Sequence, residues 1–101
     1  MRAIILGSGS KGNSTLLIGK NKKILIDVGF SYPKMLMNLK EYGVTPKDID
    51  AILVTHTHSD HIGGLSTFIK KNNITVYTNE KMLPELIKII PEELLRVEED
   101  E

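Results

Sequence analysis

The chain contains no cysteine and no tryptophan, and only 5% of its 101 residues are aromatic. Without cysteine it can form no disulfide, which excludes the small secreted scaffolds that depend on such bonds. No apolar run approaches the ~20 residues needed to cross a bilayer as a helix. The 13 basic and 13 acidic side chains cancel, so the net charge does not indicate a nucleic-acid or membrane binder.

The composition that remains is typical of a globular protein, with 41% hydrophobic and 26% charged residues. No repeat, low-complexity tract or linker divides the chain, so we expect a single domain over residues 1–101. The opening run Met1–Leu6 carries a positive charge and apolar residues, but it leads into glycines and is too short for a signal peptide. We therefore expect a cytoplasmic protein.

All three histidines fall within six residues of one another, directly after the apolar, β-branched segment Ala51–Val54. That segment is typical of a buried strand. In extended chain, residues two apart point the same way, so His56 and His58 can offer both imidazoles to one ion. The turn that follows redirects Asp60 and His61 towards a neighbouring position. Imidazole and carboxylate ligands together suit zinc, with manganese or iron as substitutes. Surface histidines on a polar loop are the alternative, but clusters this dense rarely arise without a ligand.

The glycines near the start of the chain allow two interpretations. Gly7, Gly9 and Gly12 spell G-x-G-x-x-G after a strand, and Asp27 lies twenty residues beyond Gly7, which matches the dinucleotide-binding fingerprint. That fingerprint requires a helix next, whereas Thr15–Ile18 is apolar and β-branched. We predict a hairpin, and a dinucleotide-binding domain is the alternative, one that leaves the histidines unexplained.

Elsewhere the hydrophobic periodicity indicates an α/β fold with one layer of helices on one layer of sheet. The expected strands are Met1–Leu6, Thr15–Ile18, Lys23–Asp27, Ala51–Val54 and Ile74–Thr78. The expected helices run from the Ser31 cap to Tyr42, over Leu65–Lys71, and from about Pro84 towards Ile90. The segment Pro91–Val97 fits either element.

The run from His56 to His61 resembles the His-x-His-x-Asp-His signature of the metallo-β-lactamase superfamily. This resemblance implies that His56 and His58 bind a first metal ion and that Asp60 and His61 bind a second, both most often zinc. It gives Asp60 a further catalytic task, which is to orient the attacking water or accept its proton. Asp27 corresponds to a buried aspartate that supports the metal loop without ligating. A histidine at position 58, where the flavo-di-iron branch usually has glutamate, favours the hydrolytic branch.

The stretch Gly7–Thr15 resembles the opening of the superfamily branch that contains the YycJ/WalJ-type phosphodiesterases and nucleases. The resemblance covers about the first seventy residues, and it implies a metal-dependent hydrolase of phosphodiesters, hence of nucleic acid. Hydrolysis of a small thioester, lactone or lactam is an alternative. A non-catalytic metal-binding half-domain that needs a partner is another.

The length is short for this family. The resemblance implies an αββα sandwich of roughly twice this size whose second half supplies further ligands, and no histidine follows His61. We therefore expect a truncated chain that forms the N-terminal half of the sandwich, a mixed sheet with helices on one face. The bare face would be covered by a homodimer partner or by the missing C-terminal half. Residues expected to include part of that face are Leu6, Leu16, Ile18, Leu25, Ile52 and Val54.

Overall fold

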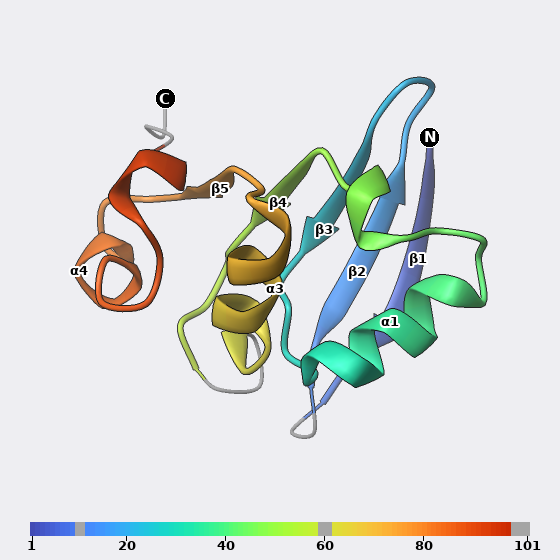
Figure 1. Cartoon of the computed structure of the whole chain (residues 1–101), viewed down its shortest axis with the longest axis horizontal. Helices are drawn as coiled ribbons and strands as arrows, with labels where there is room; N and C mark the ends of the chain where they lie inside the picture. The colour runs from blue at the N-terminus through green and yellow to red at the C-terminus, as the bar shows by residue number, and fades with distance from the viewer. Residues whose placement is uncertain (10–11, 59–61, 98–101) are drawn as a thin grey trace.

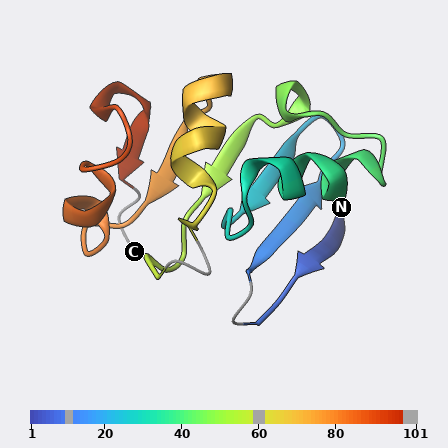
Figure 2. The ribbon, with the colours of Figure 1, turned by 60° about the horizontal axis from the view of Figure 1, so that its bottom comes forward.

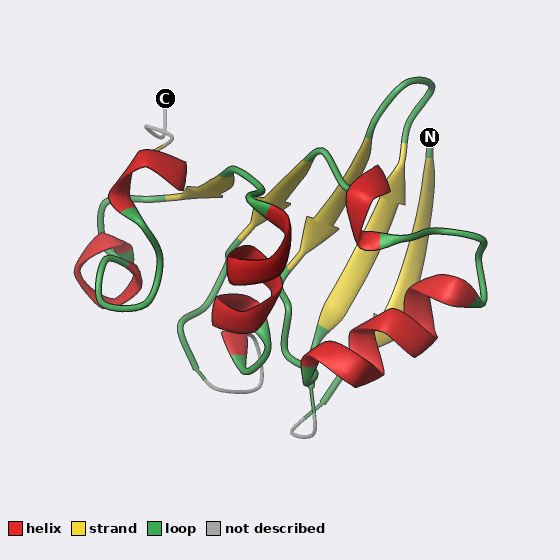
Figure 3. Ribbon diagram, in the orientation of Figure 1, coloured by secondary structure: helices red, strands yellow, loops and turns green. Residues whose placement is uncertain are grey.

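The computed structural model describes residues 1–9, 12–58 and 62–97, and these form a six-stranded sheet. Helices pack against the sheet (Figures 1 and 3). The strands are β1 Arg2–Gly7, β2 Ser14–Ile18, β3 Lys23–Ile26, β4 Ala51–Leu53, β5 Val76–Thr78 and β6 Leu95–Val97. The helices are α1 Tyr32–Lys40, α3 Leu65–Asn72 and α4 Leu83–Leu86, with 3₁₀ turns η1 Pro46–Asp48 and η2 Glu92–Leu94. The α/β class and the five predicted strands are confirmed.

The strands lie in the order β1-β2-β3-β4-β5-β6. The first three are antiparallel because short turns join them, and β3 to β6 are parallel because each connection carries a helix. The sheet is therefore mixed, as predicted. Since β1 and β2 form a hairpin, no helix follows Gly12, and the dinucleotide-binding alternative is wrong.

One face of the sheet carries the core. A row of paired, buried side chains crosses all six strands: Ile4, Leu16, Leu25, Ile52, Val76 and Leu95. The helices that cover this row contribute Met35 and Leu39 from α1 and Leu65, Phe68 and Ile69 from α3. Figure 2 shows α1 and α3 lying over the same face of the sheet.

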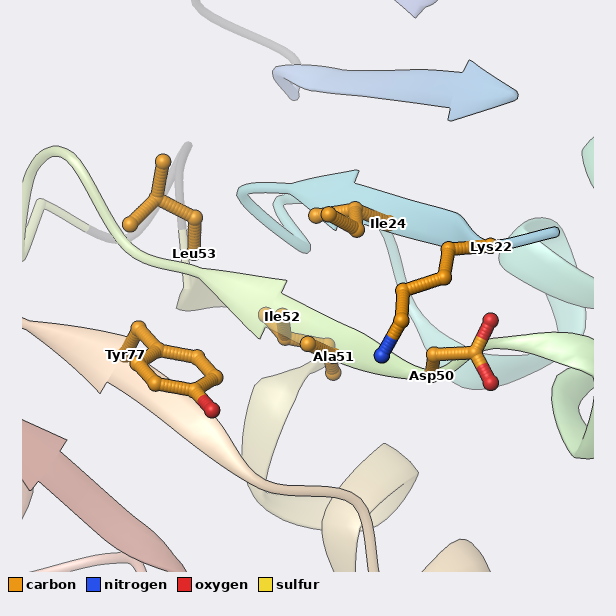
Figure 4. A pocket seen from close by; sticks show the side chains of 7 residues that line it. All are labelled: Lys22, Ile24, Asp50, Ala51, Ile52, Leu53 and Tyr77. Atoms are coloured by element: carbon orange, nitrogen blue, oxygen red, sulfur yellow. The ribbon is translucent and has the colours of Figure 1, made fainter. Parts of the chain in front are cut away.

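The opposite face of the sheet is open in the described chain, and we call it the bare face. Its alternating positions hold Ile5, Leu17, Ile24, Ile26, Leu53 and Tyr77, with Ile5 69% exposed and Leu53 36% exposed. A shallow cavity of about 360 Å³ lies there, lined by Lys22, Ile24, Asp50, Ala51, Ile52, Leu53 and Tyr77 (Figure 4).

The residues that we expected to contribute to the bare face lie instead on the covered side. Leu16, Leu25, Ile52 and Val54 are buried, and Leu6 and Ile18 pack half-buried against the same core. The predicted alternation of side chains between the two faces of the sheet was correct. The choice of face was wrong because both faces of these strands are apolar.

At the carboxyl-terminal end, one helix is shorter than predicted and the segment left ambiguous takes a definite structure. Helix α4 ends at Leu86, and the apolar residues after it continue in turns. The ambiguous segment supplies η2 and then β6, which is three residues long and too short to show a period of two. Among the described residues, none of the helices has the length and apolar character required to span a bilayer.

Candidate metal centre

Strand β4 leads directly into the segment that carries the histidines. The chain is fixed up to buried Val54, whose N–H donates to the Tyr77 carbonyl at 2.9 Å. Thr55, His56 and His58 then become exposed at the carboxyl end of the strand. In open α/β sheets this is the end at which ligands bind. The end of β1, the start of β2 and the ends of β3 and β4 meet there, because Gly7 pairs with Ser14, Thr15 with Ile26 and Ile26 with Leu53.

Of the four predicted metal ligands, Asp60 and His61 lie outside the described residues. His56 and His58 are described, and both are exposed. Within residues 1–9, 12–58 and 62–97, no group of three His, Cys, Asp or Glu side chains gathers closely enough to hold a metal ion. The four-residue ligand set and the catalytic task of Asp60 therefore stay predictions.

Asp27 is the buried carboxylate of this region, with 4% of its surface exposed. It follows β3 with a φ of 65°, a left-handed conformation that aspartate tolerates better than most residues. Its N–H donates to the Leu53 carbonyl at 2.8 Å, and its carbonyl accepts from the Ser14 hydroxyl at 2.8 Å. Hydrogen bonds to β2 and to β4 thus fix the backbone of Asp27.

The side chain of Asp27 reaches the residue that precedes the first histidine. Its Oδ1 accepts from the Thr55 N–H at 2.8 Å, and its Oδ2 accepts from the Thr55 hydroxyl at 2.5 Å. The same hydroxyl oxygen lies 3.0 Å from Nδ1 of His56. Sequence reasoning singled out Asp27 but missed Thr55, since no motif spacing marks its hydroxyl.

This donor set fits a metal ion. A histidine that ligates a metal usually holds a hydrogen bond on its other ring nitrogen, and that bond sets the orientation of the ring. His56 has such a contact at Nδ1, so Nε2 would be the atom that it offers to a metal ion. Imidazoles and a carboxylate within six residues are also the chemistry that zinc prefers.

Gly7 at the end of β1 and Gly12 before β2 pack against Phe30, in the connection that follows Asp27. A Cβ would lie 2.1 Å from the ring of Phe30 at Gly7 and 2.6 Å from it at Gly12, so a larger residue at either position would displace that ring. The Asn13 side chain closes the loop by accepting from the Gly9 N–H at 3.1 Å and donating to the Gly9 carbonyl at 2.8 Å. Packing at Gly7 and Gly12 and a φ of 126° at Gly9 account for the three glycines without a nucleotide.

The chain is similar in sequence to several known proteins. The family model described as the metallo-beta-lactamase superfamily matches residues 7–98. Over 77 residues the chain is 48% identical to exodeoxyribonuclease WalJ of Streptococcus pneumoniae serotype 2 (strain D39 / NCTC 7466) and 42% identical to exodeoxyribonuclease YycJ of Bacillus anthracis. Each match covers 76% of this chain and 29% of the relative, so the chain spans less than a third of these proteins.

The chain is also similar to a third relative and, in its fold, to a solved structure. Ribonuclease TTHA0252 of Thermus thermophilus is 29% identical over 103 residues, which cover 91% of this chain and 24% of that protein. Among solved structures, the Rm3 metallo-beta-lactamase superimposes with a TM-score of 0.77 at 25% identity. That match covers 97% of this chain and 42% of the lactamase, as expected for half of a sandwich.

Proposed function

Because this chain belongs to the metallo-beta-lactamase superfamily, we propose that it is the N-terminal half of a metal-dependent hydrolase that cleaves phosphodiesters of nucleic acid. The observation that carries the proposal is the position of His56 and His58 directly after β4, with the Asp27 carboxylate hydrogen-bonded to the residue before them. Similarity to two proteins named exodeoxyribonucleases and one named ribonuclease supports nucleic acid as the substrate class.

We assign the ligands as the sequence resemblance implies, with His56 and His58 on a first ion and Asp60 and His61 on a second. Zinc is the proposed metal, and manganese or iron are alternatives with the same ligand types. Such ions supply a hydroxide nucleophile at neutral pH and neutralise charge on the phosphoryl oxygens. Asp60 orients the attacking water or accepts its proton. Asp27 holds Thr55, and through it the start of the metal loop.

The bare face has a role in the same proposal. Isolated sheets rarely leave a continuous apolar surface in water, because its burial contributes roughly 25 cal/mol per Å². We propose that the second half of the sandwich packs on this face in the longer protein. A second copy of the chain is the alternative occupant.

The test compares substrates on the zinc- or manganese-loaded chain. We expect hydrolysis of bis-p-nitrophenyl phosphate and of single-stranded DNA to exceed hydrolysis of a chromogenic lactone or cephalosporin. The His56→Ala/His58→Ala double variant should lose both the metal and the activity, while the surface variant Lys40→Ala should keep both. Lactone or lactam hydrolysis without phosphodiester cleavage would favour the alternative hydrolase. Equal metal content in the parent and the double variant would reject the metal assignment.

A further inference from the structure

We infer that Thr55 is a positioning residue. Asp27 holds Thr55 in place, and Thr55 in turn orients the ring of His56 and fixes which ring nitrogen carries the proton. The inference rests on the proposed function, in which His56 ligates a metal ion. It concerns a residue outside the predicted ligand set, and it follows from three hydrogen-bond distances that converge on Thr55.

Thr55 has a single hydroxyl proton to donate. A hydroxyl donates one hydrogen bond and accepts others. The Thr55 hydroxyl oxygen lies 2.5 Å from Oδ2 of Asp27, the short distance of a charge-assisted O–H···O⁻ bond. The hydroxyl proton therefore points towards the Asp27 carboxylate. Thr55 is therefore the donor in this pair.

The imidazole of His56 lies beside the same hydroxyl oxygen. Since the hydroxyl proton is used, the 3.0 Å contact with His56 is a hydrogen bond in which Nδ1–H donates and the Thr55 oxygen accepts. A neutral imidazole carries one N–H, so its ring lone pair is on Nε2. The hydrogen bonds from His56 to Thr55 and from Thr55 to Asp27 thus select the tautomer of His56 that can ligate through Nε2.

Asp27 also holds the Thr55 side chain in place. The Thr55 N–H also donates to Asp27, at 2.8 Å, so two atoms of Thr55 are bonded to one carboxylate. That carboxylate is itself fixed, because the Asp27 backbone is bonded to Ser14 and Leu53. The hydroxyl is therefore held at a constant place beside the ring, although Thr55 lies at the surface.

The experiment uses Thr55→Val and Thr55→Ser in the 101-residue chain. Valine keeps the shape and the backbone N–H bond but removes the hydroxyl, whereas serine keeps the hydroxyl. In metal-free protein at a pH where the ring is neutral, ¹⁵N chemical shifts report which nitrogen of His56 is protonated. We expect Nδ1–H in the parent and in Thr55→Ser, and a shift towards Nε2–H in Thr55→Val. Thr57→Val, the same change on the same loop, should leave the tautomer of His56 unaltered.

Zinc affinity is the second measurement. Loss of a group that orients a metal ligand typically weakens binding about 10–100-fold, and we expect this for Thr55→Val with recovery in Thr55→Ser. Circular dichroism confirms that each variant is folded. An Nε2–H tautomer in the parent overturns the inference without reference to any variant.

Failure of the inference differs from failure of the proposed function. If the parent binds zinc and Thr55→Val binds it equally well, the inference is wrong and the proposed function is untouched. If the parent binds no zinc, the proposed function is wrong, and the positioning role falls with it.

Discussion

Gly64 lies directly against the backbone of Phe30: a Cβ at Gly64 would stand 1.8 Å from the Phe30 carbonyl oxygen. The Gly64 N–H donates to the Val28 carbonyl at 3.0 Å, and α3 begins at the next residue. At the other end of the predicted metal loop, Thr55 is hydrogen-bonded to Asp27. Both ends of the predicted metal loop are therefore attached to one short connection, residues 27–30.

This close approach predicts that Gly64→Ala destabilises the fold. The contact is with backbone, which cannot rotate away, so α3 or the 27–30 connection must shift at a cost of about 1–3 kcal/mol or more. Urea unfolding measures the loss. Gly19→Ala is the matched control, because a Cβ there meets only the Lys22 carbonyl oxygen at an ordinary 3.5 Å. Equal stability of the two variants would contradict the packing described.

Asp27→Asn should fold but bind zinc less tightly. Asparagine tolerates the left-handed φ of 65°. Its amide offers one acceptor oxygen and places an NH₂ donor where a second acceptor is needed, so Thr55 can no longer donate both of its bonds. We expect zinc affinity to fall about 10–100-fold by isothermal titration.

A matched control for that change is Asp50→Asn. Asp50 precedes β4 at the opposite end of the strand, where its carboxylate accepts from the Lys23 N–H at 2.8 Å. This variant removes the same charge and should leave zinc affinity unchanged. If Asp27→Asn also keeps the parent affinity, Asp27 is a turn residue without influence on the metal loop.

The sequence was sufficient for the fold class, the hairpin and the family because those depend on local signals. Thr15–Ile18 reads as strand, and the His-x-His-x-Asp-His run has few other interpretations. The face of the sheet was not predictable, because Leu16 and Leu17 are equally apolar and only the placement of α1 and α3 decides which is buried. Thr55 was missed for a similar reason, since its partner is 28 residues away.

Asp48, in the turn before β4, should make the stability of the folded state depend on pH. Its carboxylate accepts from the Thr45 N–H at 2.8 Å and from the Thr45 hydroxyl at 3.0 Å, and these bonds lower the pKa of Asp48. A lowered pKa stabilises the folded state above the ordinary aspartate pKa of about 3.9, and this contribution is lost as the pH falls through the folded value. Asp48→Asn should therefore be less stable than the parent at neutral pH and approach it in acid. Thermal unfolding across pH measures this difference, and a constant difference at all pH values would contradict it.

The 101-residue chain alone should be a poor hydrolase. If His56, His58, Asp60 and His61 are divided between two ions, each has two protein ligands, where catalytic zinc usually has three and a water. Such sites bind weakly and misplace the nucleophile, and a misplacement of ~1 Å costs about 100-fold in rate. We expect kcat/KM on bis-p-nitrophenyl phosphate to be lower by at least that factor than for full-length pneumococcal WalJ. Equal turnover from a verified monomer would contradict the divided ligand set.

The bare face predicts that the isolated chain associates. Ile5, Ile24, Leu53 and Tyr77 share it, and several hundred Å² of apolar surface left in water forfeits on the order of 10 kcal/mol. That is comparable with the whole stability of a typical domain. Light scattering at micromolar concentration should therefore show dimers or larger species.

Two lysine substitutions locate the contact. Leu53→Lys places a charge in the middle of the bare face and should shift the chain towards monomer, because association would then bury an unpaired ammonium group. Met37→Lys makes the same change on α1, where Met37 is 65% exposed on the helical side, and should leave the association unaltered. If Met37→Lys disperses the chain and Leu53→Lys does not, the contact lies on the helices. A parent chain that stays monomeric would mean that the sheet tolerates its open side, and the second half of the sandwich would then not be required to cover it.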